Sequence, residues 1–131
     1  MTTENAHGWH SRPVLFVADL DRALRFYVGT LGFWKEWHEN DGAGSVCQVR
    51  FGDCEIILCR DAERRDKSRF FVELTAGDLA KLRRLLAEKS VPSKQTWWGY
   101  DSIQINDPDG HEWLFPIEGN RPASNIQEVA T

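Results

Sequence analysis

The sequence lacks the features that mark membrane, secreted and zinc-knuckle proteins. Its longest uninterrupted apolar run, Val14 to Ala18, is far too short to span a bilayer, and no apolar stretch near the first residue resembles a secretory signal. It has only three cysteines and none in a CxxC spacing, so neither a disulfide framework nor a zinc knuckle is indicated. The composition therefore favours a soluble, cytoplasmic protein without a membrane partner.

The sequence also lacks an excess of positive charge. Sixteen Lys and Arg against 20 Asp and Glu give a net charge of −4, which argues against a nucleic-acid partner and mildly favours a cationic one. The 131 residues fit one domain and leave no room for a second substrate or nucleotide domain. Tryptophan is unusually frequent at six residues, which indicates flat surfaces for packing or for stacking a ligand.

The most informative pattern is an internal repeat of about sixty residues. The Asp-Leu pairs that begin at Asp19 and Asp78 lie 59 positions apart, and the turn glycines Gly52 and Gly110 lie 58 apart. Such a repeat predicts two similar structural units. We expect a single domain, 1–131, with a first module at about 13–59, a mixed-charge linker at 60–69, a second module at about 70–117 and a tail at 118–131.

Each module follows the order strand, helix and three strands. In the first, strands are predicted at 14–17, 33–37, 46–51 and 54–59, with a helix capped by Asp19 that ends at Gly32. In the second, strands are predicted at 70–75, 94–98, 102–106 and 112–117, with a helix capped by Asp78.

Alternation along these strands predicts which side chains meet the helices. The helix-covered face carries Leu15, Val17, Cys47, Val49, Phe51, Ile56, Leu58, Phe70, Val72, Leu74, Ile103, Ile105, Trp113 and Phe115. The opposite face, called the mixed face below, carries Arg12, Val14, Phe16, Gln48, Arg50, Glu55, Ile57, Cys59, Phe71, Glu73, Ser102, Gln104, Asn106, Glu112 and Leu114. Polar groups among apolar ones favour a sheet curved around a ligand cleft, and the alternative is a face that simply meets solvent.

Two segments carry a resemblance to a known family. With "DLDRALRFYVGTLGF" from Asp19 and "WGYDSIQINDPDGHEWLF" from Trp98, the chain resembles the glyoxalase/bleomycin-resistance/dioxygenase superfamily, also called vicinal oxygen chelate proteins, over roughly 13–116. The resemblance implies an α+β fold in which two βαβββ modules form a cupped mixed sheet around a cleft, with helices on the outer face, and commonly a homodimer. It implies several possible activities, because this fold hosts many.

The metalloenzymes of this superfamily carry metal ligands, usually His and Glu, at four strand positions. In this sequence those positions hold Arg12, Ile56 or Ile57, Phe71 and Leu114. A guanidinium and three hydrocarbon side chains cannot coordinate a divalent ion. The resemblance is therefore to the metal-free branch, typified by bleomycin-resistance proteins, and we expect neither a metal nor another cofactor.

A displaced metal site is the alternative. His10, Glu55, Glu73 and Glu112 have suitable ligand chemistry, and each stands two residues from an expected position. The displacement runs forward at Glu73 and backward at the other three, so no single shift of register brings the four together.

The leading hypothesis is a homodimeric binding protein that sequesters a small aromatic or cationic molecule without a metal. The predicted ligand-binding residues are Arg12, Phe16, Gln48, Arg50, Glu55, Phe71, Glu73, Trp97, Trp98, Gln104 and Glu112. One rival hypothesis is a metal-dependent lyase, isomerase or dioxygenase, in which a divalent ion polarises vicinal oxygens. A third is a metal-free enzyme that uses Glu73 or Glu112 as a base.

Overall fold

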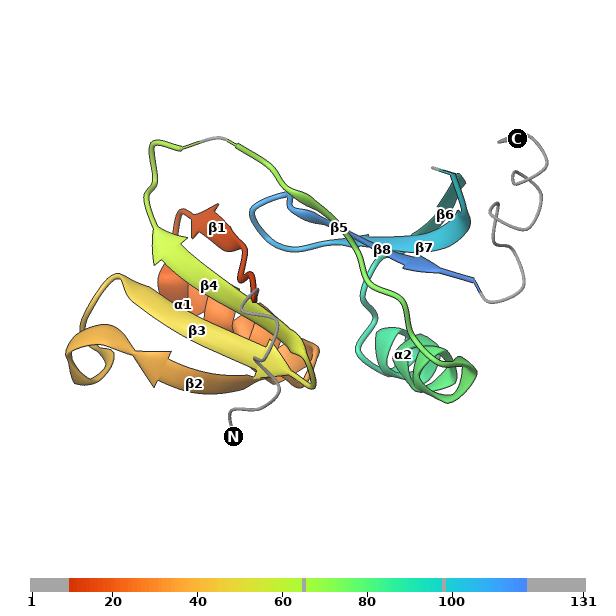
Figure 1. Cartoon of the computed structure of the whole chain (residues 1–131), viewed down its shortest axis with the longest axis horizontal. Helices are drawn as coiled ribbons and strands as arrows, with labels where there is room; N and C mark the ends of the chain where they lie inside the picture. The colour runs from red at the N-terminus through yellow and green to blue at the C-terminus, as the bar shows by residue number, and fades with distance from the viewer. Residues whose placement is uncertain (1–9, 65, 98, 118–131) are drawn as a thin grey trace. The chain divides into compact units, whose positions relative to one another are not determined.

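The computed structural model describes residues 10–64, 66–97 and 99–117, and the chain divides into two compact units between residues 65 and 66 (Figure 1). Each unit has one strand, a helical segment and three further strands, and its four strands form one mixed sheet; the first unit also has a short 3-10 helix, Glu39–Gly42, between its second and third strands. The predicted α+β fold with two βαβββ modules is confirmed. The boundary between the units lies inside the predicted linker.

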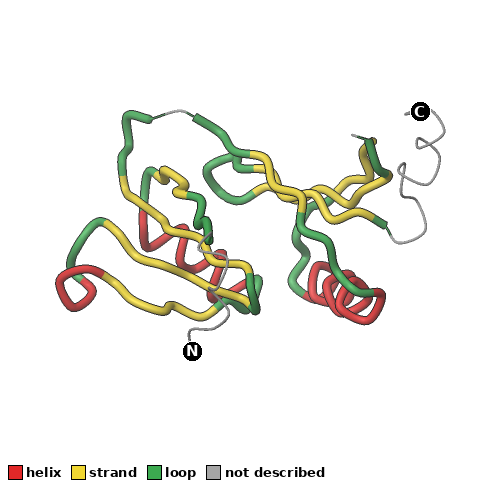
Figure 2. Tube along the Cα trace, viewed as in Figure 1, coloured by secondary structure: helices red, strands yellow, loops and turns green. Residues whose placement is uncertain are grey.

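The first sheet has the strand order β1-β4-β3-β2. Its strands are β1 (Val14–Val17), β2 (Trp34–His38), β3 (Val46–Phe51) and β4 (Cys54–Arg60). Strands β2, β3 and β4 pair antiparallel, whereas β1 pairs parallel to β4. A parallel pair needs a crossover connection, which the helical segment between β1 and β2 begins (Figure 2).

The helical segment of the first unit changes its geometry halfway. Asp19 caps α1 (Leu20–Leu24) by accepting a hydrogen bond from the backbone N of Arg22 at 3.1 Å, as predicted. The segment then continues as a π-helix at Arg25–Thr30, where the sequence predicted an uninterrupted α-helix. The wider turn buries Tyr27, whose ring contacts those of Phe26 and Phe33 edge-on at 5.1 and 5.5 Å.

The second sheet repeats the arrangement with the order β5-β8-β7-β6. Its elements are β5 (Arg69–Phe71), α2 (Ala76–Glu88), β6 (Lys94–Trp97), β7 (Asp101–Asn106) and β8 (Glu112–Pro116). The predicted cap of α2 is wrong: Thr75, not Asp78, is the N-cap, and its Oγ1 accepts a hydrogen bond from the backbone N of Asp78 at 3.1 Å. Strand β5 is correspondingly shorter than the predicted 70–75, because residues 72–75 lead into the helix.

The predicted helix-covered face supplies most of the core. Ten of its members are buried: Leu15, Val17, Cys47, Val49, Ile56, Leu58, Ile103, Ile105, Trp113 and Phe115. Phe51 was predicted there wrongly and is 53% exposed. It is the last residue of β3, next to the turn at Gly52, and its ring packs at the edge against Phe33 and Trp34 at 5.6 and 6.3 Å. No helix among the described residues is long and apolar enough to cross a membrane.

Candidate functional site

A row of four side chains crosses the mixed face of the first sheet. Val14 on β1 pairs with Ile57 on β4, Ile57 with Gln48 on β3, and Gln48 with Trp37 on β2. Residues that face each other across paired strands point to the same side of the sheet. The row therefore places a neutral amide between two apolar side chains and an indole.

Gln48 is the centre of a hydrogen-bond network in this row. Its Oε1 accepts from Arg12 Nη1 at 2.8 Å and from Trp37 Nε1 at 3.2 Å, and its Nε2 donates to Glu36 Oε1 at 2.6 Å. Gln48 is only 3% exposed, so these bonds replace the hydrogen bonds that its amide group would make to water. Gln48 is thereby held in one orientation, and the predicted site residues Arg12 and Gln48 are in contact.

Two carboxylates of the first unit, those of Glu36 and Glu55, are bonded to basic side chains. Arg50 Nη1 lies 2.9 Å from Glu36 Oε2 and 3.3 Å from Glu55 Oε2, and His10 Nε2 lies 3.0 Å from Glu55 Oε1. The hydrogen bond from Arg50 is the main cause that lowers the pKa of Glu36 and, reciprocally, raises the pKa of Arg50. Glu55 and Arg50 were predicted as ligand contacts, and the structure shows them bonded to each other.

The ring of Phe16 is in contact with an arginine side chain. The guanidinium carbon of Arg64, from the segment after β4, lies 4.0 Å from the centre of the Phe16 ring. This is a short cation–π contact, in which arginine is a frequent partner because its planar group can stack on the ring. One side of the predicted aromatic wall at Phe16 is thus covered by the protein itself.

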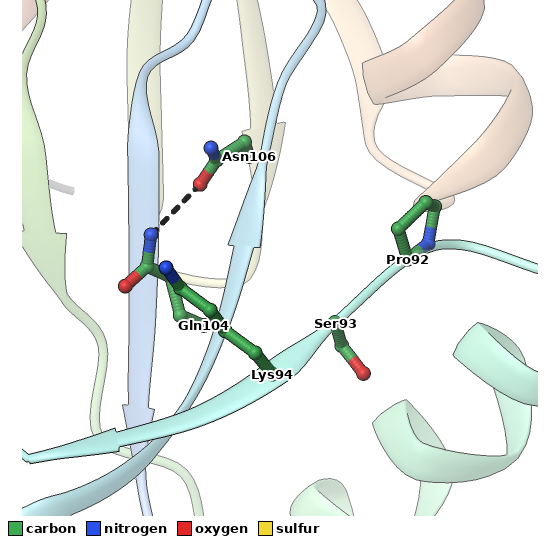
Figure 3. A pocket seen from close by; sticks show the side chains of 5 residues that line it. All are labelled: Pro92, Ser93, Lys94, Gln104 and Asn106. Atoms are coloured by element: carbon green, nitrogen blue, oxygen red, sulfur yellow. Dashed lines mark hydrogen bonds between the residues drawn. The ribbon is translucent and has the colours of Figure 1, made fainter.

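A corresponding row crosses the second sheet. Phe71 pairs with Leu114, Leu114 with Gln104 and Gln104 with Lys94, so the second unit also places a buried glutamine at the centre of its row. Gln104 Nε2 donates to Asn106 Oδ1 at 3.0 Å, beside an open hollow of about 310 Å³ (Figure 3). The hollow is lined by Pro92, Ser93, Lys94, Gln104 and Asn106.

The other predicted residues of the second unit have different surroundings. The Phe71 ring, 40% exposed, meets Tyr100 edge-on at 5.4 Å. Glu112 Oε1 lies 2.6 Å from Arg69 Nε, and Glu73 is exposed after β5. Trp97 is 63% exposed at the end of the edge strand β6, and Trp98 lies outside the described residues.

The residues at the expected metal positions do not fit a metal. Ile56 is buried on the helix-covered face, so the place on β4 belongs to Ile57, and Arg12, Phe71 and Leu114 complete the set. None of these four side chains can coordinate a divalent ion. In the described parts of the chain no three His, Cys, Asp or Glu side chains form a group that could hold one.

Glu36 and Arg64 shape the first mixed face and were not predicted to do so, and Trp37 was not among the predicted ligand-binding residues. A β-bulge between Lys35 and Trp37 lets both Glu36 and Trp37 contact Gln48, although strict alternation would send them to opposite faces. No residue in the sequence marks this bulge. Arg64 lies in the predicted linker, where its contact with Phe16 carries no sequence signal either.

The chain was compared with known proteins. Comparison with the curated proteins gives no match. Among solved structures, it is similar to an integron cassette protein from the mobile metagenome of the Halifax Harbour sewage outfall, with a TM-score of 0.66, 20% identity and 79% and 94% of the two chains covered. A fosfomycin resistance protein from Listeria monocytogenes has a TM-score of 0.66, 12% identity and 82% and 90% coverage.

A lactoylglutathione lyase from Agrobacterium tumefaciens is also similar, with a TM-score of 0.64, 15% identity and 80% and 90% of the two chains covered. At these identities the likeness shows the fold alone. The family model described as "Glyoxalase/Bleomycin resistance protein/Dioxygenase superfamily" matches residues 10–115, which include both sheets. The chain belongs to the Glyoxalase/Bleomycin resistance protein/Dioxygenase superfamily.

Proposed function

We propose that the protein binds a small aromatic molecule without a metal ion and sequesters it unchanged, as bleomycin-resistance proteins do. One observation carries this proposal: the places where metalloenzymes of the superfamily need ligands hold Arg12, Ile57, Phe71 and Leu114. Arg12 can only donate hydrogen bonds, Ile57 and Phe71 can only offer apolar surface, and Leu114 is an apolar side chain that is fully buried. The accessible members of this set have the properties of a binding surface.

The apolar and aromatic groups of the two mixed faces support an aromatic ligand. Phe71 and Trp37 keep much of their rings exposed, and each lies beside a buried glutamine row. Covering such surface contributes roughly 25 cal/mol per Å² before the costs of association. The glutamine amides would then orient polar groups of the ligand, as small numbers of polar groups do in other binding sites.

The charges of the first unit support an aromatic ligand better than a cationic one. Glu36 and Glu55 already have Arg50 as an ion-pair partner, and Glu55 also has a hydrogen bond with His10, so a cation binding there would compete with existing contacts.

Two measurements test the proposal. Purified protein, analysed for zinc, nickel, manganese and iron before and after EDTA, should hold no stoichiometric metal, and 2-naphthamide should bind equally with and without EDTA and be recovered unchanged. Binding is followed by the indole N–H signals in ¹H–¹⁵N spectra. About one metal ion per chain, retained on dialysis and lost in Glu112→Ala, would instead support the metal-dependent enzyme, and chemically altered probe would support the metal-free enzyme.

A matched pair of variants locates the surface. Trp37→Ala should weaken 2-naphthamide by on the order of 1 kcal/mol, because it removes an exposed ring from the mixed face of the first sheet. Trp97→Ala removes an exposed indole at the end of β6 in the other unit, and it should leave the affinity unchanged. Equal effects of the two variants would show that the probe binds elsewhere.

A further inference from the structure

Arg12 differs from Arg50 and Arg69 in the kind of group that it contacts. Arg50 and Arg69 each lie within 3.0 Å of a carboxylate oxygen, at 2.9 Å from Glu36 and 2.6 Å from Glu112 respectively. Arg12 instead donates to the neutral amide of Gln48, and within the described ranges no carboxylate lies at ion-pair distance from it. Glu36 feels the charge of Arg12, but its two oxygens are bonded to Gln48 and Arg50.

The guanidinium of Arg12 is nevertheless held in place. Its partner, Gln48, is almost completely buried and makes three hydrogen bonds, so the accepting oxygen is fixed. An arginine has five N–H donors in a planar fork, and the bond to Gln48 uses one of them. The side chain is exposed, so the remaining donors can reach a ligand.

An aromatic surface lies directly beside this cation. Trp37 Nε1 donates to the same oxygen atom that Arg12 contacts, which makes the indole and the guanidinium neighbours and fixes the plane of the indole. Trp37 is 41% exposed on the edge strand β2, and Ile57 and Val14 continue the row on the other side of Gln48. A positive donor and a flat apolar surface therefore lie next to each other on one sheet face.

We infer that Arg12, Gln48 and Trp37 form a subsite for an aromatic carboxylate. The guanidinium binds the carboxylate, the indole packs against the aromatic ring, and Gln48 is a positioning residue that holds both. Such charge-assisted bonds between a guanidinium and a carboxylate are short, strong and directional. The inference rests on the proposed function and goes beyond it, because it assigns the ligand a negative charge.

Three probes with one ring system and three charges test this assignment. They are 2-naphthoate, 2-naphthamide and 2-naphthamidine, which are anionic, neutral and cationic. Wild type should bind the carboxylate about tenfold more tightly than the amide, and the amidine least tightly. The indole N–H signal of Trp37, identified by its loss in Trp37→Phe, should shift most with the carboxylate.

Variants separate the charge of Arg12 from its geometry. Arg12→Gln should abolish the preference for the carboxylate and leave amide binding unchanged, whereas Arg12→Lys should retain part of the preference because it keeps the charge but not the planar fork. Arg25→Gln is the control: it removes the same charge from an exposed position in the helical segment of the same unit, and the preference should persist.

The possible failures are distinguishable. If the amide binds but the carboxylate has no advantage, or Arg12→Gln keeps that advantage, the subsite is wrong and the proposed function stands. Tightest binding of the amidine would overturn the subsite as well, because it would show that Glu36 and Glu55 still attract cations. If none of the three probes binds, the proposed function fails and the subsite fails with it.

Discussion

Arg12 and Gln48 are 36 positions apart in the sequence, and their side chains meet at 2.8 Å on the mixed face of the first sheet. The contact joins a residue that precedes the first strand to the centre of the third. Gln48 is buried and Arg12 is exposed. The bond therefore holds the guanidinium at the surface in a fixed position relative to the core.

Replacing Gln48 by leucine should destabilise the protein more than the same change at Gln104. Gln48→Leu removes one acceptor and one donor that serve three neighbours, with an expected cost of about 1 to 3 kcal/mol. Gln104 is similarly buried but makes one such bond, to Asn106. Urea unfolding of the two variants measures the difference, and an equal or smaller loss at Gln48 would contradict the central role of this amide.

The carboxyl group of Glu36 should titrate below its usual range. Its pKa is lowered mainly by the hydrogen bond from Arg50, so the pair stabilises the fold above the unfolded pKa and this stabilisation is lost as the pH falls through the folded pKa. Arg50→Gln should raise the pKa of Glu36, which carboxyl ¹³C NMR titration can follow. An unchanged titration in this variant would show that Arg50 is not the cause.

Two of the three cysteines should react slowly in the folded protein. Burial raises the pKa of Cys47 to about 11, and burial together with the charge of Glu55 raises that of Cys54 to about 11. The thiolate is the reactive form, so iodoacetamide at pH 8 should modify both far more slowly than in urea, as read by mass spectrometry. Equal rates with and without urea would contradict this protection.

The same cysteines predict a loss of stability at alkaline pH. A thiol whose folded pKa is raised favours the folded state below the unfolded value, and this advantage disappears as the pH rises from the usual 9.0 to about 11. Cys47→Ala should remove the contribution of Cys47 to that decline. Unfolding midpoints measured across this pH range in both proteins provide the comparison.

The hairpin between β7 and β8 should depend on a buried histidine. His111 Nδ1 accepts a hydrogen bond from the backbone N of Ser68 at 3.0 Å, just before β5. His111→Ala leaves that N–H without its acceptor, and we expect a loss of about 1 to 3 kcal/mol in urea unfolding. His111→Asn keeps an acceptor at a similar position and should restore part of the loss.

The protein should be a homodimer in solution. Large aromatic side chains are exposed on edge strands of both sheets, at Trp34 on β2 and Trp97 on β6, and surfaces of this kind usually mark interaction sites. Light scattering at micromolar concentration should therefore give about twice the chain mass of 15.1 kDa. A monomeric mass would contradict the dimer and favour a pairing of the two modules within one chain.

The parts of the fold that follow short-range rules could be predicted from the sequence. The repeat predicts two modules because the same order of elements recurs, and strict alternation in β3 and β4 predicts the burial of Cys47, Val49, Ile56 and Leu58. The capping role of Asp19 also depends only on its neighbours. Each of these features is encoded within a few residues.

The details that define the site depend on geometry that alternation does not contain. The β-bulge at Glu36 changes which side chains share a face, and the π-helix at Arg25–Thr30 changes which residues are covered. The pairing of Glu55 with Arg50 likewise needs the cross-strand register to be known. The sequence places Arg50 and Glu55 on the same predicted face, but their contact with each other appears only in three dimensions.

The position of Arg64 over Phe16 turns ligand binding at that ring into an exchange reaction. A flat molecule that stacks on the same side of Phe16 must first displace a guanidinium that belongs to the protein and is always present. Its apparent binding free energy is therefore the difference between its own stacking energy and that of Arg64. A ligand whose stacking on Phe16 is weaker than that of Arg64 does not bind there. The short segment after β4 thus competes with ligands for this side of the Phe16 ring and sets the minimum stacking energy that a ligand needs to bind there.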